Sequence, residues 1–175
     1  MSASTVKKIA IIGPESTGKS WLAEQLASHY STSWVPEYAR EYLDTIDRPY
    51  VQEDLTEIAK GQLELEGRKM EEAHNFLFCD TNLIVINIWS DHKYGNTDPF
   101  ILNHLQVEGY DHYLLTNIDL PWEPDPLREH PDMRDHFFKA YHQYMLKHRH
   151  PFDLISGVGE SRLKSAITAI DSIQD

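Results

Sequence analysis

The amino-acid sequence predicts an α/β fold in which helices cover a parallel sheet of about five strands. Short apolar runs alternate along the chain with longer segments whose apolar residues recur every three or four positions, the patterns of strands and of amphipathic helices. The first apolar run, residues 9–12, is continuous, as is typical of a parallel strand buried on both faces. The 175 residues of the chain suit one domain. We therefore expect residues 1–175 to form a single domain around one sheet.

Each expected element rests on one of these two patterns. The expected strands are residues 9–12, 33–35, 76–79, 112–116 and 152–155. The expected helices are about residues 19–30, 53–74, 83–93, 99–107, 134–148 and 160–173. In the first helix, Leu22, Ala23, Leu26 and Ala27 fall on one face. Because helical segments separate the strands, we expect the strands to run parallel, joined by crossover connections.

A proline-rich segment interrupts this alternation. Residues 119–131 contain four prolines in thirteen positions, and proline has no N–H for a helix or a central strand. Long loops in compact domains often close over a site. Since Arg128 and Arg134 accompany Trp122 in this stretch, we interpret residues 119–134 as a lid.

Composition excludes several classes of function. With 28 acidic and 16 basic residues, the net charge is −12, so neither a nucleic-acid nor a membrane partner has general electrostatic support. The single cysteine, Cys79, excludes an intramolecular disulfide framework and a cysteine-based metal site, and the ten histidines are scattered. The apolar stretch near the amino terminus is too short for a signal peptide or membrane span. We therefore expect a cytoplasmic protein and leave its oligomeric state open.

The strongest motif is a phosphate-binding loop at residues 13–20. Its sequence, Gly-Pro-Glu-Ser-Thr-Gly-Lys-Ser, matches G-x-x-x-x-G-K-[ST] and lies between an expected strand and an expected helix. Backbone N–H groups of such a loop converge on phosphate oxygens. The expected nucleotide-binding residues are Gly13, Glu15, Ser16, Thr17, Gly18, Lys19 and Ser20, with the role of position 21 left open. Lys19 is expected to reach the β- and γ-phosphates, and Ser20 to supply a hydroxyl to Mg²⁺. The motif predicts binding of a nucleoside triphosphate such as ATP.

The phosphate loop alone does not distinguish a GTPase, a motor and a small-molecule kinase. A guanine-reading segment would contain Asn/Thr-Lys-x-Asp, and residues 116–119, Thr-Asn-Ile-Asp, lack the lysine. The short chain and the lid favour a kinase, which must keep water away from the transferring phosphoryl group. A nucleotide-binding regulatory module without turnover is the non-enzymatic alternative.

Two carboxylates are candidates for catalysis, Glu37 and Asp80. Each follows an expected strand, and open α/β sheets bind ligands beyond the carboxyl ends of their strands. Asp80 also ends an apolar run in the manner of a Walker B acid, which orders Mg²⁺ or its waters. Which of the two acts as base is open; alternatively, Asp80 caps the next helix and Glu37 is an ordinary exposed acid.

Cationic and aromatic residues complete the candidate site. Arg40 lies three residues after Glu37, a spacing at which the two can pair on a helix. Arg128 in the lid either neutralises charge on the γ-phosphate or pins the loop. The loop of residues 156–162 could support an adenine ring, although its Gly-x-Gly is a weak signal. The aromatic residues that could stack on a flat ring, cationic or neutral, or belong to the core, are Tyr38, Tyr42, Trp89 and Trp122.

Four separated motifs together resemble a known family. In order, they are the loop of residues 13–20, Pro-Glu-Tyr-Ala-Arg-Glu-Tyr at 36–42, Phe-Cys-Asp-Thr at 78–81 and Leu-Pro-Trp-Glu-Pro-Asp-Pro-Leu-Arg at 120–128. The series is similar to the nicotinamide riboside kinase domain of the NadR family, over about residues 8–173. Larger members of that family join this domain to an adenylyltransferase and often to a DNA-binding segment, which the resemblance does not cover.

The resemblance implies a P-loop kinase that uses ATP and Mg²⁺ to phosphorylate the ribose 5′-hydroxyl of nicotinamide riboside. The product would be nicotinamide mononucleotide. The implied catalytic residues are Lys19, Glu37, Asp80 and Arg128. The family often has Trp-Glu-Tyr-Gly-Arg at the second motif, with the tryptophan against nicotinamide, whereas this chain has Pro36 and Ala39. This departure motivates the alternative of a kinase for another vitamin or nucleoside.

Overall fold

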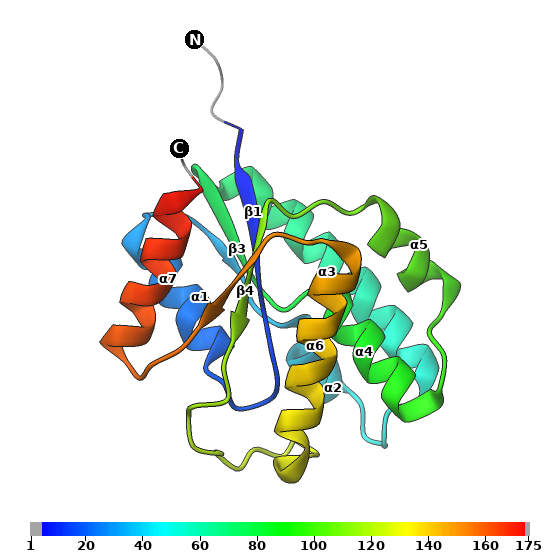
Figure 1. Ribbon diagram of the computed structural model, residues 1–175. Coiled ribbons are helices and arrows are strands. Elements are labelled where there is room, and N and C mark those ends of the chain that lie inside the picture. Colours follow the sequence, from blue (N-terminus) through cyan, green and yellow to red (C-terminus); the bar gives the residue numbers. More distant parts are fainter. Residues whose placement is uncertain (1–4, 174–175) are drawn as a thin grey trace.

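The apolar runs form one five-stranded sheet in the computed structural model, which describes residues 5–173 (Figure 1). Its strands are β1 (Lys7–Ile12), β2 (Trp34–Val35), β3 (Phe76–Asp80), β4 (His112–Thr116) and β5 (Phe152–Ile155). They lie in the order β2-β3-β1-β4-β5, and every neighbouring pair is parallel. The expectation of a parallel sheet of about five strands is confirmed.

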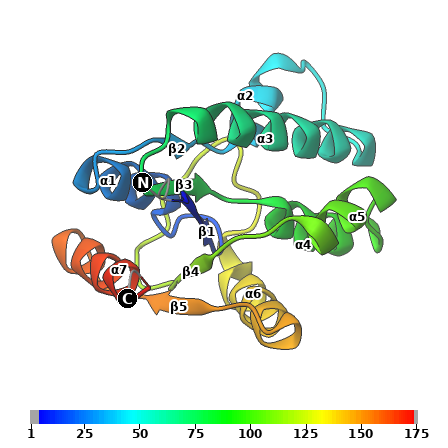
Figure 2. The same ribbon diagram turned by 90° about the horizontal axis from the view of Figure 1, so that it is seen from above.

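Helices cover both faces of the sheet, as Figure 2 shows from above. One face is covered by α1 (Lys19–His29) and α7 (Glu160–Ser172), and the other by α3 (Gln52–Glu72), α4 (Leu83–Tyr94) and α6 (Arg134–His148). Two shorter helices, α2 (Tyr38–Thr45) and α5 (Pro99–Val107), pack against α3 and α4. These layers bury β1 on both sides: Ile9 and Ile11 face α1 and α7, while Ala10 and Ile12 face α4 and α6.

The six expected helices are present, two of them with the expected ends and the others with ends that differ by one or two residues. Helix α2 is the element that sequence patterning missed. None of its residues is fully buried, and it is only eight residues long. Its apolar residues Tyr38, Ala39, Tyr42 and Leu43 share one face, but that face covers only two turns and is too short to stand out as a helical period. It packs on α3 through Tyr38, whose ring fills the space where a side chain on Gly61 would lie. Strand β3 also extends one residue beyond the expected run, to include Asp80.

The turn after β1 requires glycine. Gly13 has φ +148°, and a Cβ atom there would lie 2.2 Å from the hydroxyl oxygen of Thr116 at the end of β4. This close approach brings the loop after β1 against the segment after β4. The lid, residues 119–134, is irregular except for a 3₁₀ turn at Pro131–Met133 and the first residue of α6. Among the described residues, no helix is long and apolar enough to cross a membrane.

Candidate functional site

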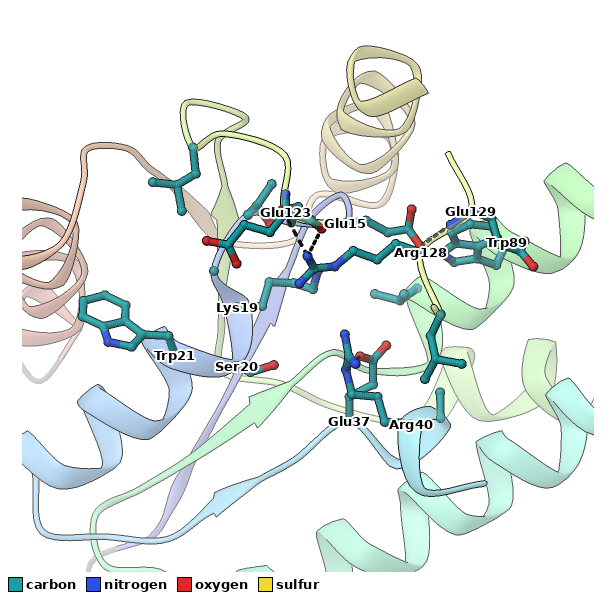
Figure 3. A pocket seen from close by; sticks show the side chains of 18 of the residues that line it. Glu15, Lys19, Ser20, Trp21, Glu37, Arg40, Trp89, Glu123, Arg128 and Glu129 are labelled. Carbon is teal, nitrogen blue, oxygen red and sulfur yellow. Dashed lines mark hydrogen bonds and ion pairs between the residues drawn. The ribbon is translucent and has the colours of Figure 1, made fainter. Parts of the chain in front are cut away.

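A cavity of about 670 Å³ opens at the carboxyl edge of the sheet (Figure 3). Its walls come from the phosphate loop, α2, α3, α4, the lid and the start of α7. This is the edge at which parallel α/β sheets bind ligands, because the loops after successive strands meet there. The expected site residues that line it are Gly13, Glu15, Ser16, Thr17, Gly18, Lys19, Ser20, Glu37, Arg40 and Arg128. Trp21, the residue at the position left open, also lines the cavity.

The phosphate loop is held in place by buried hydrogen bonds to its own backbone and to β4. Thr17 is fully buried, and its hydroxyl contacts the Thr116 hydroxyl at 2.7 Å and the Pro14 carbonyl at 2.8 Å. Gly18, which precedes α1, has φ +76°, a left-handed conformation that lets the loop turn into the helix. The loop therefore holds its shape through contacts with its own backbone and with β4, and α1 begins with its free N–H groups at the cavity.

Arg162 braces the same loop, and sequence patterning missed it. Its guanidinium group is fully buried and donates to the carbonyl oxygens of Thr17, Asn117 and Gly157 at 2.7 to 2.9 Å, and to the Asp119 carboxylate at 2.7 Å. One cation thus joins the phosphate loop to the start of the lid and to the loop before α7. A charged residue in the first turn of a surface helix gives no sequence signal of such burial. Val158 and Gly159 of the loop expected near adenine also line the cavity.

Lys19, Ser20 and Asp80 lie together at the start of α1. The Lys19 ammonium group donates to the Pro14 carbonyl at 2.8 Å, and the Ser20 hydroxyl donates to Asp80 Oδ2. Asp80 Oδ1 is buried and has no hydrogen-bond partner among residues 5–173. Burial, together with the nearby negative charge of Glu37, raises the pKa of Asp80 to about 7, although Lys19 opposes the shift. The carboxylate therefore has an unsatisfied oxygen next to the phosphate loop.

This donor set fits a hard divalent cation but does not complete its coordination. A hydroxyl and a carboxylate oxygen are the ligands that Mg²⁺ prefers. In the part of the chain that the structure describes, no group of three or more His, Cys, Asp and Glu side chains could hold a metal ion. A cation bound by Ser20 and Asp80 would thus need further oxygens, and phosphates in the adjoining loop would provide them.

Glu37 and Arg40 form a second charged group on the opposite wall. Glu37 precedes α2, and its carboxylate lies 3.7 Å from Arg40 Nε, so the pairing expected from their spacing is present. Arg40 Nη1 also donates to Asp125 of the lid at 2.9 Å. Asp125 was not among the expected residues, because nothing in a proline-rich segment defines which side chain faces which wall. Arg40 therefore links the start of α2 to the lid.

Arg128 extends from the lid toward the phosphate loop. Its guanidinium group donates to the Ser16 hydroxyl at 3.4 Å and to the Glu123 carbonyl (Figure 3). These contacts pin the lid, which is one of the two roles expected for Arg128. The same position leaves its positive charge at the cavity wall beside the loop, so the other role is open to it as well.

Of the four aromatic candidates, Trp89 is the one that lines the cavity among the described residues. Its ring is stacked on Phe137 at 5.0 Å between ring centres and on His130 at 5.4 Å. Trp34 packs instead with the core beneath α1 and α7, so it does not replace the family tryptophan at the position of Pro36. Tyr50, which sequence reasoning missed, lines the cavity and donates its hydroxyl to Glu129 at 3.3 Å.

Comparison with known proteins gives one family model and several relatives. A model of the AAA domain family matches residues 8–162. The trifunctional NAD biosynthesis/regulator protein NadR of Escherichia coli (strain K12) is 30% identical over 129 residues, which cover 70% of this chain and 31% of the relative. The protein of the same name from Salmonella typhimurium (strain LT2) is 29% identical over 129 residues, again 70% of this chain and 31% of the relative. The chain thus spans about a third of the length of these relatives.

Solved structures extend the likeness to nearly the whole chain. A crystal structure of NadR protein in complex with NR has a TM-score of 0.78 at 19% identity, covering 96% of this chain and 51% of that one. Deoxyadenosine kinase from M. mycoides has a TM-score of 0.62 at 15% identity, covering 95% and 99%. Thymidylate kinase from Ehrlichia chaffeensis has a TM-score of 0.61 at 14% identity, covering 97% and 99%. At these identities the likeness shows a shared fold.

Proposed function

Because the chain belongs to the AAA domain family, we propose that it is an ATP-dependent kinase that phosphorylates the ribose 5′-hydroxyl of nicotinamide riboside. The product is nicotinamide mononucleotide, an intermediate of NAD synthesis. One observation carries the proposal: a single cavity joins a phosphate loop, the Glu37 carboxylate and a lid that bears an arginine, and the buried Asp80 lies behind Ser20 of its wall. The similarity to NadR over 70% of the chain supports the choice of acceptor.

The donor side of the cavity would hold ATP. The backbone N–H groups of residues 13–20 and the Lys19 ammonium group would bind the phosphates, and Ser20 and Asp80 would hold Mg²⁺. Mg²⁺ bound there would neutralise charge on the β- and γ-phosphate oxygens. The unpartnered Oδ1 of Asp80 supports its assignment to the metal.

The acceptor side would place the hydroxyl near Glu37. The 5′-oxygen attacks the γ-phosphorus, the bond from that phosphorus to the β,γ-bridging oxygen breaks, and ADP leaves. Glu37 takes the proton from the hydroxyl, because it lines the cavity whereas Asp80 is buried behind Ser20. Arg128 then stabilises negative charge on the transferring group, and the closed lid keeps water out.

A second acceptor class is favoured by one observation. The residue before Glu37 is Pro36, and Trp34 faces the core, so the flat surface for a base comes from elsewhere, with Trp89 on α4 the candidate. A different stacking surface suits a different base. The alternative is therefore a kinase for another vitamin or nucleoside. In either case the partners are small molecules, and we place the protein in the cytoplasm, where ATP is abundant.

The decisive experiment is an acceptor panel with purified protein, ATP and Mg²⁺. Formation of nicotinamide mononucleotide from nicotinamide riboside, measured by chromatography, is the expected result. Faster turnover of deoxyadenosine, thymidine or another nucleoside would support the alternative acceptor. Tight ATP binding with no phosphorylated acceptor in the panel would contradict enzymatic function and favour a regulatory module.

A further inference from the structure

Glu15 is an acid within a loop that binds polyanions. Its side chain is half-buried, and its carboxylate accepts hydrogen bonds from two successive backbone N–H groups of the lid. The backbone nitrogen of Glu129 lies 3.3 Å from Oε1, and the backbone nitrogen of His130 lies 3.3 Å from Oε2. Figure 3 shows Glu15 and Glu129 side by side at the cavity. Both oxygens of Glu15 are thus directed to the lid rather than to the place where phosphates would lie.

Ser16, the next residue of the loop, binds a second segment of the lid, at Pro121 and Glu123. Its hydroxyl accepts from the Glu123 N–H at 2.9 Å and donates to the Pro121 carbonyl at 3.3 Å. Arg128 lies between the two held points in the sequence. Adjacent residues of the phosphate loop therefore fix the lid on both sides of the arginine that the kinase reaction needs.

Because Glu15 is an acid, its stability beside a bound polyanion depends on whether the lid supplies the two hydrogen bonds from residues 129 and 130. A carboxylate beside a bound polyanion is unfavourable unless water or hydrogen-bond donors surround it. Burial raises the pKa of Glu15, and the lid N–H groups of His130 and Glu129 oppose that rise. With the lid closed, these two donors take the place of water around the carboxylate, and hydrogen bonds to a charged acceptor are among the stronger ones.

We propose that Glu15 is a positioning residue that holds the lid closed over the phosphate loop, so that Arg128 is fixed beside the transferring phosphoryl group and water is kept out. This inference rests on the proposed kinase function. It assigns the Glu15 side chain to the lid and leaves only the backbone of that residue to the nucleotide. Nucleotide binding and lid closure would then depend on the same short loop.

The test compares Glu15→Gln and Glu15→Ala with Glu24→Gln, an acid-to-amide change at an exposed position of α1. Both Glu15 variants should raise the ratio of ATP hydrolysed to acceptor phosphorylated by about tenfold, since each removes charge-assisted hydrogen bonds to the lid. The kcat for phosphoryl transfer should fall while the KM for ATP stays within about twofold of wild type. Glu24→Gln should match wild type in all three measurements.

Hydrogen exchange provides a readout that does not depend on catalysis. With ATP bound, the amides of residues 129 and 130 should exchange about tenfold faster in both Glu15 variants than in wild type and Glu24→Gln. Unchanged exchange at these amides, or a fall in ATP affinity that parallels the loss of transfer with no extra hydrolysis, would overturn the proposal. A wild-type protein that phosphorylates nothing would instead contradict the proposed function, and the exchange experiment would still report whether Glu15 holds the lid.

Discussion

Two buried carboxylates lie at opposite ends of the sheet, and they are held in different ways. At the amino end, both oxygens of Glu66 on α3 have partners: the Tyr110 hydroxyl donates to one at 2.7 Å and the Lys8 ammonium group to the other at 3.1 Å. At the carboxyl end, Asp80 accepts from the Ser20 hydroxyl through one oxygen, and its other oxygen has no hydrogen-bond partner among the described residues.

The protonation equilibria of the two acids are nevertheless similar. Burial is the main cause in each case and raises the pKa of both to about 7, and a second acid adds to it: Glu108 for Glu66, and Glu37 for Asp80. A raised pKa alone therefore does not distinguish a functional acid from a structural one. The distinguishing feature is the oxygen of Asp80 that has no hydrogen-bond partner beside the phosphate loop, whereas both oxygens of Glu66 are hydrogen-bonded. In the network around Glu66, the buried oxygen without a partner among the described residues is Oε2 of the neighbouring Glu108.

The largest effect on the carboxyl end is expected from Lys19→Ala. Because Lys19 is the cationic side chain of the phosphate loop, its loss should lower kcat/KM for phosphoryl transfer by roughly a thousandfold. The free energy of unfolding should change by less than about 0.5 kcal/mol, since Lys19 lies at the cavity and supports no core packing. Steady-state kinetics and urea unfolding measure the two quantities. A large loss of stability with activity retained would reverse the roles assigned to the two ends.

The next largest effect on activity is expected from an acid-to-amide change at the carboxyl end of the sheet, with the same change at the amino end as its control. Asp80→Asn should lower kcat by about a hundredfold, because it removes the charge that would hold Mg²⁺. It should also raise the free energy of unfolding by about 1 kcal/mol at pH 8, since a poorly satisfied buried charge is lost. Glu66→Gln is the matched control and should leave kcat unchanged. If both amides lowered kcat equally, the distinction between the two acids would fail.

Removing the cation at the amino end of the sheet should lower the stability of the protein. Lys8→Met keeps most of the apolar stem but leaves Glu66 and Glu108 as neighbouring buried acids without the ammonium group that pairs with both. The free energy of unfolding at pH 8 should fall by about 2 to 3 kcal/mol, as for other buried pairs that lose one partner. The activity of the folded protein should not change. Urea unfolding and kinetics at a temperature well below the transition would separate the two effects.

The sequence was sufficient to predict most of the fold, since its elements have strong local patterns. The continuous run of β1 and the glycine-rich turn after it indicated a buried parallel strand that leads into a helix, and both are present. The positions of Glu37 and Asp80 at one edge followed from the same reasoning, because carboxyl ends of parallel strands meet. Helix α2 was missed because its apolar face, made by Tyr38, Ala39, Tyr42 and Leu43, covers only two turns, too few for a period to stand out.

Parts of the site could not be predicted because they depend on long-range pairing in an irregular segment. The lid has no period, so the sequence gives no reason for Asp125 to meet Arg40 or for Glu15 to meet Glu129 and His130. The burial of Arg162 is a similar case, since its partners are mainly backbone carbonyls of three separate loops. Carbonyl oxygens are present at every residue, so they leave no trace in side-chain patterns.

The last expected effect is on stability alone, and it is the pH dependence that Glu66 contributes. Its pKa is about 7 in the folded protein and near 4.5 when unfolded, so the fold disfavours the ionised form. The stability contribution of the group is therefore full below about pH 4.5 and is lost as the pH rises through 7, by about 3 kcal/mol in total. Glu66→Gln removes this titration. The difference in unfolding free energy between wild type and this variant should fall across that window and be constant above it. A difference that instead grew with pH would mean that Lys8 holds Glu66 ionised in the fold, and the amino end would then be an ordinary ion pair.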